Sequence, residues 1–104
     1  MTIAPEPFLV EVTSDPSGLV VRVTGELDVV SAPTLGACLL GLDADVVVDL
    51  ADVTFMDSTG IAALVAGHNP ALLRGRSFGL RSPTERVAKV LHLTGVDEVL
   101  NVEP

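Results

Sequence analysis

The chain has 104 residues, 48% of them hydrophobic, which suits one domain that buries an aliphatic core without metals or disulfides. It has no Trp or Tyr, and 14 acidic against 6 basic residues give a formal net charge of -8. The lack of Trp and Tyr argues against binding of single-stranded nucleic acid by base stacking. The negative charge argues against binding to nucleic acid or anionic membranes in general. It permits a protein partner with a basic face. The single cysteine, Cys38, excludes an intramolecular disulfide.

The N-terminus is predicted to be a flexible tail over residues 1–6, followed by one domain over residues 7–104. The tail lacks the basic segment and apolar core of a secretory signal. No apolar run approaches the roughly 20 residues that span a bilayer. We therefore expect a cytoplasmic protein without membrane insertion.

Two strands joined by a tight turn are predicted to open the domain. Residues 8–12 and 19–24 are rich in β-branched and apolar side chains, and residues 19–24 alternate between two faces. The intervening segment Ser14–Gly18 combines Asp, Pro, Ser and Gly, which is a dense turn signal. The pattern predicts a β-hairpin.

A helix and a central strand are predicted next. Ser31 is expected to cap the helix, with Pro33 in its first turn and Gly41 at its end. The apolar stripe of this helix consists of Leu35, Cys38, Leu39 and Leu42. Residues 44–50 form the most apolar run of the chain and predict a central strand.

A second helix is expected to begin near Ser58 or Thr59 and to run to about Gly67. Proline inside a helix costs about 3 kcal/mol, so we expect Pro70 to stop or kink it. Residues 75–81 resemble a short strand.

The last third is predicted to hold a third helix and a final strand. Residues Ser82–Glu85 read as a capping box with Pro83 at the first helical position, and residues 98–102 as the strand. The order β-β-α-β-α-β-α-β predicts an α/β fold, with a mixed sheet, an N-terminal hairpin and about three helices.

The segment Asp57–Gly60, Asp-Ser-Thr-Gly, lies between the apolar strand and the second helix. Asp and Ser are common helix caps, so this tetrad is explained equally well by capping alone. A helix start also carries unpaired N–H groups and partial positive charge, which favour anions. A phosphate on the Ser58 hydroxyl would suit this position.

Three stretches together resemble the STAS-domain family, and more narrowly bacterial anti-sigma factor antagonists. The stretches are Gly25–Asp28, Val48–Leu50 with Phe55–Gly60, and Ser82–Pro83 with Leu91–Asp97. The resemblance extends over about residues 8 to 102. It implies a STAS-like fold, a regulatory function without enzymatic activity, and no cofactor or metal. The segment from Gly60 to Ser82 is slightly short for the family, and Pro70 suggests a truncated second helix.

The resemblance also implies site residues and partners. Ser58 maps onto the phosphorylation site of the family, with Thr59 as the alternative, and Asp28, Asp57, Ser58, Thr59 and Gly60 onto the partner-binding surface. The unphosphorylated protein would bind an anti-sigma factor that is also its serine kinase, thereby releasing the sigma factor. Phosphorylation would end this binding and a serine phosphatase would restore it. The alternative is a non-switching scaffold subunit of a lipid-transport or stress-signalling assembly. The oligomeric state, monomer or weak dimer, stays open.

Other chemistries are less well supported by the residues. A serine hydrolase needs an elbow such as Gly-x-Ser-x-Gly, but Met56 stands two residues before Ser58. His68 is expected to be a partly buried structural residue or a helix C-terminal cation. Asp49 is expected to end its strand and bond to the following turn. Too few His and Cys residues are present for a typical zinc site. Arg74, Arg76 and Arg81 are expected to form a solvated basic cluster.

Overall fold

The computed structural model describes residues 7–104, so the predicted tail, residues 1–6, lies outside the described residues. Over this range the chain forms five strands and three α-helices in the predicted order, with a short 3-10 helix, η1, before the last strand. The elements are β1 (Leu9–Asp15), β2 (Gly18–Leu27), α1 (Ala32–Leu40), β3 (Val46–Met56), α2 (Ser58–Leu73), β4 (Phe78–Arg81), α3 (Glu85–Leu93), η1 (Val96–Glu98) and β5 (Asn101–Glu103). The predicted α/β fold is confirmed.

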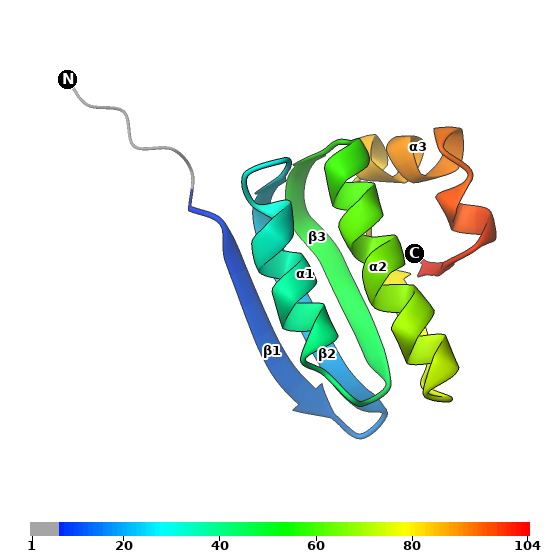
Figure 1. Cartoon of the computed structure of the whole chain (residues 1–104). Coiled ribbons are helices and arrows are strands. Elements are labelled where there is room, and N and C mark those ends of the chain that lie inside the picture. Colours follow the sequence, from blue (N-terminus) through cyan, green and yellow to red (C-terminus); the bar gives the residue numbers. More distant parts are fainter. Residues whose placement is uncertain (1–6) are drawn as a thin grey trace.

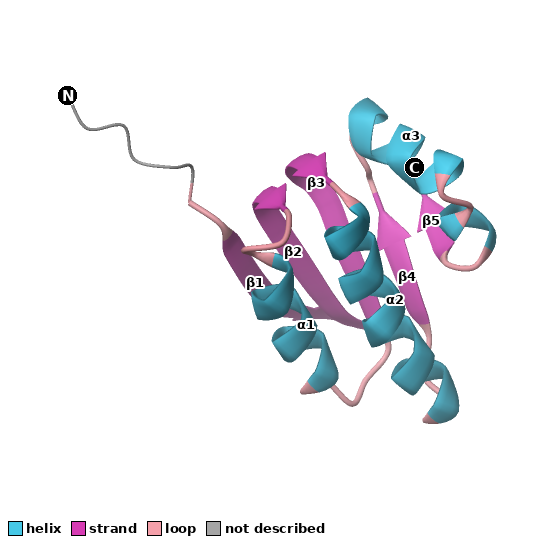
Figure 2. Ribbon diagram, turned by 45° about the horizontal axis from the view of Figure 1, so that its top comes forward, coloured by secondary structure: helices cyan, strands magenta, loops and turns pink. Residues whose placement is uncertain are grey.

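The strands form one mixed sheet in the order β1-β2-β3-β4-β5. Only β1 and β2 pair antiparallel, as the predicted hairpin, and the other neighbours are parallel. Helices α1 and α2 lie side by side on one face of the sheet (Figure 1). Helix α3 lies at the end of the sheet where β2 and β3 terminate (Figure 2). Among the residues that the structure describes, no helix is long and apolar enough to cross a membrane.

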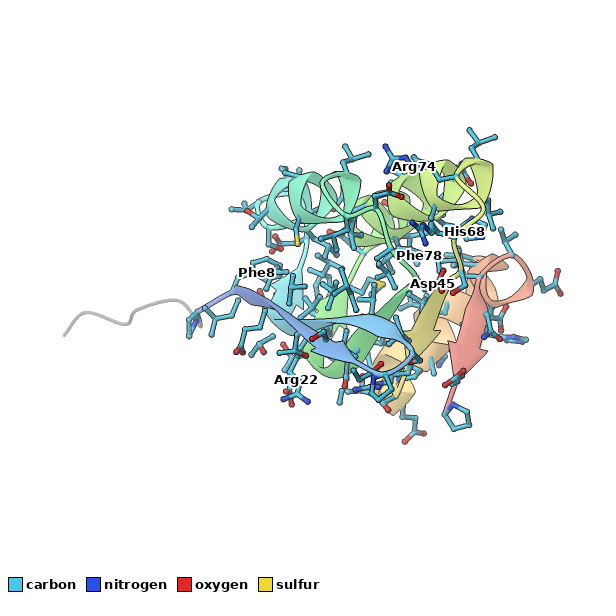
Figure 3. The ribbon with its side chains drawn as sticks, turned by 90° about the horizontal axis from the view of Figure 1, so that it is seen from below. Phe8, Arg22, Asp45, His68, Arg74 and Phe78 are labelled. Atoms are coloured by element: carbon cyan, nitrogen blue, oxygen red, sulfur yellow. The ribbon has the colours of Figure 1, made fainter. Side chains whose placement is uncertain are left out.

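The hydrophobic core lies between the sheet and the helix pair. Its fully buried members include Val21 and Val23 of β2, Val48 and Leu50 of β3, Leu35 of α1, and Leu64 of α2. Helix α2 approaches α1 closely at Gly67, where a Cβ would lie 2.8 Å from Cδ1 of Leu39. The next residue, His68, is buried and packs edge-on against Phe78, with ring centroids 6.0 Å apart (Figure 3). The structural alternative for His68 is therefore confirmed.

A charged row crosses the sheet face that points away from α1 and α2, where Figure 3 shows Arg22. Successive register partners in this row alternate in sign across all five strands: Glu11, Arg22, Asp49, Arg81 and Glu103. The buried carboxylate of Asp49 lies 3.1 Å from Arg81 Nη2 and 3.9 Å from Arg22 Nη2. Asp49 therefore lies inside β3 and not at its end, although its Oδ1 does accept from the Ala51 N–H.

The predicted cluster of three arginines is wrong, because β4 carries Arg81 into this row. The other two members lie at the end of α2, where Arg76 pairs with Asp43 at 3.3 Å and Arg74 donates to the Leu42 carbonyl at 3.5 Å. Arg81 is bound to Asp49 on the sheet, whereas Arg74 and Arg76 contact the segment that follows α1.

The expected stop at Pro70 is also wrong, because α2 continues through it to Leu73. The alternative, a kink at Pro70, stays a prediction. Pro70 lies in the last turn, so its missing N–H leaves only the carbonyl of Ala66 without a helical partner, and Ala66 is exposed to water. The second helix is consequently not truncated.

Further boundaries differ from prediction. The central strand, β3, extends to Met56, well beyond the predicted end at residue 50. Helix α3 is capped by Thr84, whose hydroxyl accepts from the Val87 N–H at 3.2 Å, and not by Ser82, which adopts a left-handed conformation with φ of 55° before the helix. The last strand begins only at Asn101, because residues 96–98 form η1.

Candidate functional site

Two turns that each begin with an aspartate lie at adjacent ends of the parallel strands β2 and β3. The first, Asp28–Ser31, leads into α1, and the second, Asp57–Gly60, consists of the N-cap and the first three residues of α2. The turns are joined directly, because the Asp57 N–H donates to the carbonyl of Leu27 at 3.3 Å. The predicted partner-binding residues of both turns are thus brought to one edge of the molecule.

Asp57 caps α2 with its side chain. Its Oδ1 accepts from the Thr59 N–H at 2.9 Å, from the Gly60 N–H at 3.3 Å and from the Thr59 hydroxyl. The hydroxyl bond from Thr59 is the main reason why the pKa of Asp57 lies below its usual range, and the two N–H groups add to the effect against partial desolvation. The carboxylate is therefore a fixed negative charge beside Ser58.

Ser58 and Thr59 are placed very differently, although they are neighbours in the sequence. Ser58 is the first residue of α2 and is exposed, and within residues 7–104 its hydroxyl has no hydrogen-bond partner. Thr59 is half-buried and its hydroxyl is bound to Asp57. Of the two predicted phosphorylation sites, Ser58 is the one with an accessible hydroxyl.

Gly60 allows the two turns to meet. A Cβ at this position would lie 2.8 Å from Cγ of Leu27, 2.9 Å from the Leu27 carbonyl oxygen and 3.0 Å from Cγ of Met56. Any side chain would push α2 away from the end of β2. Gly60 is buried, so it supports the predicted partner-binding surface from below and is not exposed on it.

The carboxylate of Asp28 is hydrogen-bonded within its own turn. Its Oδ1 accepts from the N–H groups of Val30 at 3.0 Å and Ser31 at 3.1 Å. Ser31 occupies the predicted N-cap position of α1 but makes no capping bond; its hydroxyl donates to the Glu26 carbonyl at 2.6 Å. The predicted position of Ser31 at the N-cap of α1 is therefore confirmed, but its side chain does not cap the helix, because its hydroxyl is bound within the preceding turn.

Sequence reasoning missed two features of the site. It did not distinguish the free hydroxyl of Ser58 from the engaged hydroxyl of Thr59. It also passed over Val29 and Val30, whose side chains are 68% and 83% exposed. A usable signal was present, because Asp28-Val-Val-Ser and Asp57-Ser-Thr-Gly each begin with an aspartate where a predicted strand gives way to a predicted helix.

The arrangement offers little for nucleophilic catalysis. His68 lies ten residues along α2 from Ser58, about 15 Å by helical rise, and packs against Phe78. The Nδ1 of His92 pairs with Asp97 at 3.0 Å. Within the described part of the chain, no group of three His, Cys, Asp or Glu side chains could hold a metal ion. An exposed hydroxyl on a helix start, flanked by acidic turns, suits covalent modification and protein binding.

The structure is a small α/β domain with an exposed serine at the start of α2, and comparisons with known proteins identify its family. The family model described as "Mlab, STAS domain" matches residues 10–102. The chain is 32% identical over 96 residues to the anti-sigma-B factor antagonist of Bacillus subtilis (strain 168), with 89% of this chain and 88% of the relative covered. The chain therefore belongs to the STAS-domain family.

Solved structures agree with this assignment. An anti-sigma factor antagonist from Mycobacterium paratuberculosis matches with a TM-score of 0.86 and 30% identity over 97% of this chain and 89% of that chain. An anti-sigma-factor antagonist (STAS) domain protein from Planctomyces limnophilus matches with a TM-score of 0.75 and 27% identity over 90% and 88%. The names of these relatives support a function as an anti-sigma factor antagonist, which is regulatory.

Proposed function

We propose that this protein is a cytoplasmic anti-sigma factor antagonist controlled by phosphorylation of Ser58. The unphosphorylated form binds an anti-sigma factor that is also a serine kinase, and this binding releases the sigma factor. Transfer of phosphate from ATP to the Ser58 hydroxyl ends the binding. A serine phosphatase then hydrolyses the phosphoserine and restores the active form. The domain itself acts by binding and not by catalysis.

The observation that carries this proposal is the exposed hydroxyl of Ser58 at the first position of α2. A kinase needs an accessible hydroxyl, and the adjacent Thr59 hydroxyl is already bound to Asp57. The relatives named anti-sigma-B factor antagonists supply the class of partner.

The site also explains why a phosphate would act as a switch. A phosphate adds a charge of about −1.5 to −2 at pH 7. The N–H groups of Thr59 and Gly60, which would otherwise receive it, are occupied by Asp57. The new charge would therefore face the partner beside a carboxylate that is already negative. An uncompensated charge buried in an interface costs about 3–5 kcal/mol, which corresponds to about 10²–10³-fold or more in affinity.

A kinase assay tests the proposal. The purified protein is incubated with its anti-sigma factor and MgATP, and the product is analysed by intact mass and peptide mapping. We expect a gain of about 80 Da at Ser58. Thr59→Val should still be phosphorylated, whereas Ser58→Ala should not. Phosphate on Thr59 in the wild type would contradict the assignment of Ser58.

A complex that forms but shows no transfer of phosphate to Ser58 in the presence of MgATP would instead support the scaffold alternative. In that case the domain would stay bound to its assembly whether or not ATP is present. The same incubation, followed by size-exclusion chromatography, separates the two functions. Chromatography of the purified protein alone reports whether it is a monomer or a weak dimer.

A further inference from the structure

Val29 and Val30 are unusual residues for a turn between a strand and a helix. Turns favour Gly, Pro, Asn, Asp and Ser, whereas these two β-branched side chains are 68% and 83% exposed. Single exposed apolar residues are common on protein surfaces. Here two are consecutive, and a third partly exposed apolar residue, Phe55, stands in register with Glu26 at the end of the neighbouring strand.

The backbone that carries the two valines is held rigidly. Asp28 accepts from the Val30 N–H at 3.0 Å and the Ser31 N–H at 3.1 Å, and the Ser31 hydroxyl accepts from the Asp28 N–H at 3.0 Å. A preorganised turn loses little conformational entropy when a partner covers it. Among the described residues, the other consecutive pair of exposed apolar side chains, Leu72 and Leu73, lies in the last turn of α2, at the opposite end of this helix from Ser58.

The valine turn lies beside the modifiable serine. Leu27 immediately precedes Asp28, and its carbonyl accepts from the Asp57 N–H at 3.3 Å, while Gly60 packs against it. Figure 2 shows the connection from β2 to α1 and the connection from β3 to α2 at the same end of the sheet. One partner surface can therefore cover both turns.

We infer that Val29 and Val30 form the apolar anchor by which this domain docks onto its anti-sigma factor, and that Asp28 is a positioning residue for this anchor. The inference rests on the proposed function. The partner chemistry follows from the surroundings: an apolar pocket that receives the two valines, with basic residues around it. Glu26, which is exposed, and Asp57, which is half-buried, stand at the ends of β2 and β3 beside the anchor, on a chain with a formal net charge of -8. Their negative charge would face this basic rim.

This inference changes the expected function of Asp28. The family resemblance implies that Asp28 contacts the partner, whereas its carboxylate points into the turn and holds Val30 and Ser31. If the carboxylate acts through the turn, an amide oxygen can replace it, because Asn supports the same type of turn. If it acts through its charge, Asn cannot replace it.

Calorimetric titration of the unphosphorylated protein into the purified anti-sigma factor tests both parts. The double variant Val29→Ser/Val30→Ser should bind about 100-fold more weakly, because two valine side chains lose their burial in the interface. The matched control Leu72→Ser/Leu73→Ser removes exposed apolar side chains at the other end of α2 and should bind as the wild type does. Thermal unfolding of each variant confirms that the fold is retained.

The second part compares Asp28→Asn with Asp28→Ala. We expect Asn to keep the affinity within about threefold and Ala to weaken it at least tenfold, because only Ala releases the turn. Equal losses for Asn and Ala would assign Asp28 to a direct charge contact and overturn its positioning role. Valine variants that bind like the wild type would overturn the anchor. A wild-type protein that does not bind the anti-sigma factor at all would overturn the proposed function itself, and the inference with it.

Discussion

The two turns of the site use the same capping chemistry but expose different side chains. In each, an aspartate accepts from the N–H groups two and three residues later: Asp28 from Val30 and Ser31, and Asp57 from Thr59 and Gly60. The first turn presents two valines and the second presents a serine hydroxyl. We interpret this difference as a division of function. The valines of the first turn supply affinity for the partner, and phosphorylation of the serine in the second turn removes this affinity.

The comparison also shows how the turns depend on each other. Leu27 is fully buried beneath both, and its carbonyl accepts the N–H of Asp57. A change at this junction should disturb both turns, whereas a change in one aspartate should act mainly on its own turn.

The largest effect is expected at Leu27. Truncation by Leu27→Ala leaves a cavity under both turns and should lower the free energy of unfolding by about 2–5 kcal/mol. Leu73→Ala is the control, because this leucine is 90% exposed and its loss should change stability by less than about 0.5 kcal/mol. Urea denaturation followed by circular dichroism measures both. Equal stability of the two variants would contradict the conclusion that Leu27 supports both turns.

A smaller loss is expected for Gly60→Ala. The added methyl group meets the Leu27 carbonyl oxygen at 2.9 Å, which is backbone and cannot swing away. Overpacking of this kind costs about 1–3 kcal/mol.

Gly36→Ala is the matched control for Gly60→Ala, because Gly36 lies inside α1 and an added Cβ meets nothing within 4 Å. It should stabilise the protein by about 0.5–1 kcal/mol. Thermal unfolding of both variants should show opposite signs, and a stabilising Gly60→Ala would refute the close approach of the turns.

The smallest effect is expected from Asp57→Asn and depends on pH. The pKa of Asp57 is depressed in the folded state, mainly by the Thr59 hydroxyl. Its carboxylate therefore stabilises the fold above the unfolded-state pKa, near about 4, and this contribution disappears as the pH falls through the lower folded-state pKa. Wild type should be the more stable protein at neutral pH, and the difference in Tm should narrow below about pH 4. A difference in Tm between the wild type and Asp57→Asn that does not change with pH would contradict stabilisation by the charged Asp57 carboxylate.

Much of the fold could be predicted because local residues determine it. The hairpin follows from the turn at Pro16–Gly18, and the order of elements from the apolar runs that alternate with helical patterns. Pro70 misled the prediction, since proline is costly in a helix interior but not in a final turn whose freed carbonyl is exposed. The start of β5 depends on pairing with β4, which no local pattern encodes.

The candidate site was predicted in its location but not in its detail. The tetrad after a buried strand indicated a helix start, and the structure places Asp57 there as the cap. Which hydroxyl is free depends on a single side-chain bond from Thr59 to Asp57. The exposure of Val29 and Val30 depends on the direction in which the first turn leaves the sheet. Both are properties of the three-dimensional arrangement.

The central claim is that one phosphate on Ser58 switches partner binding, and paired affinity measurements test it most directly. The same preparation is titrated against the anti-sigma factor by calorimetry before and after stoichiometric phosphorylation of Ser58, with nucleotide removed. The account predicts that the phosphorylated protein binds at least about 100-fold more weakly. Equal dissociation constants for the two forms would contradict it.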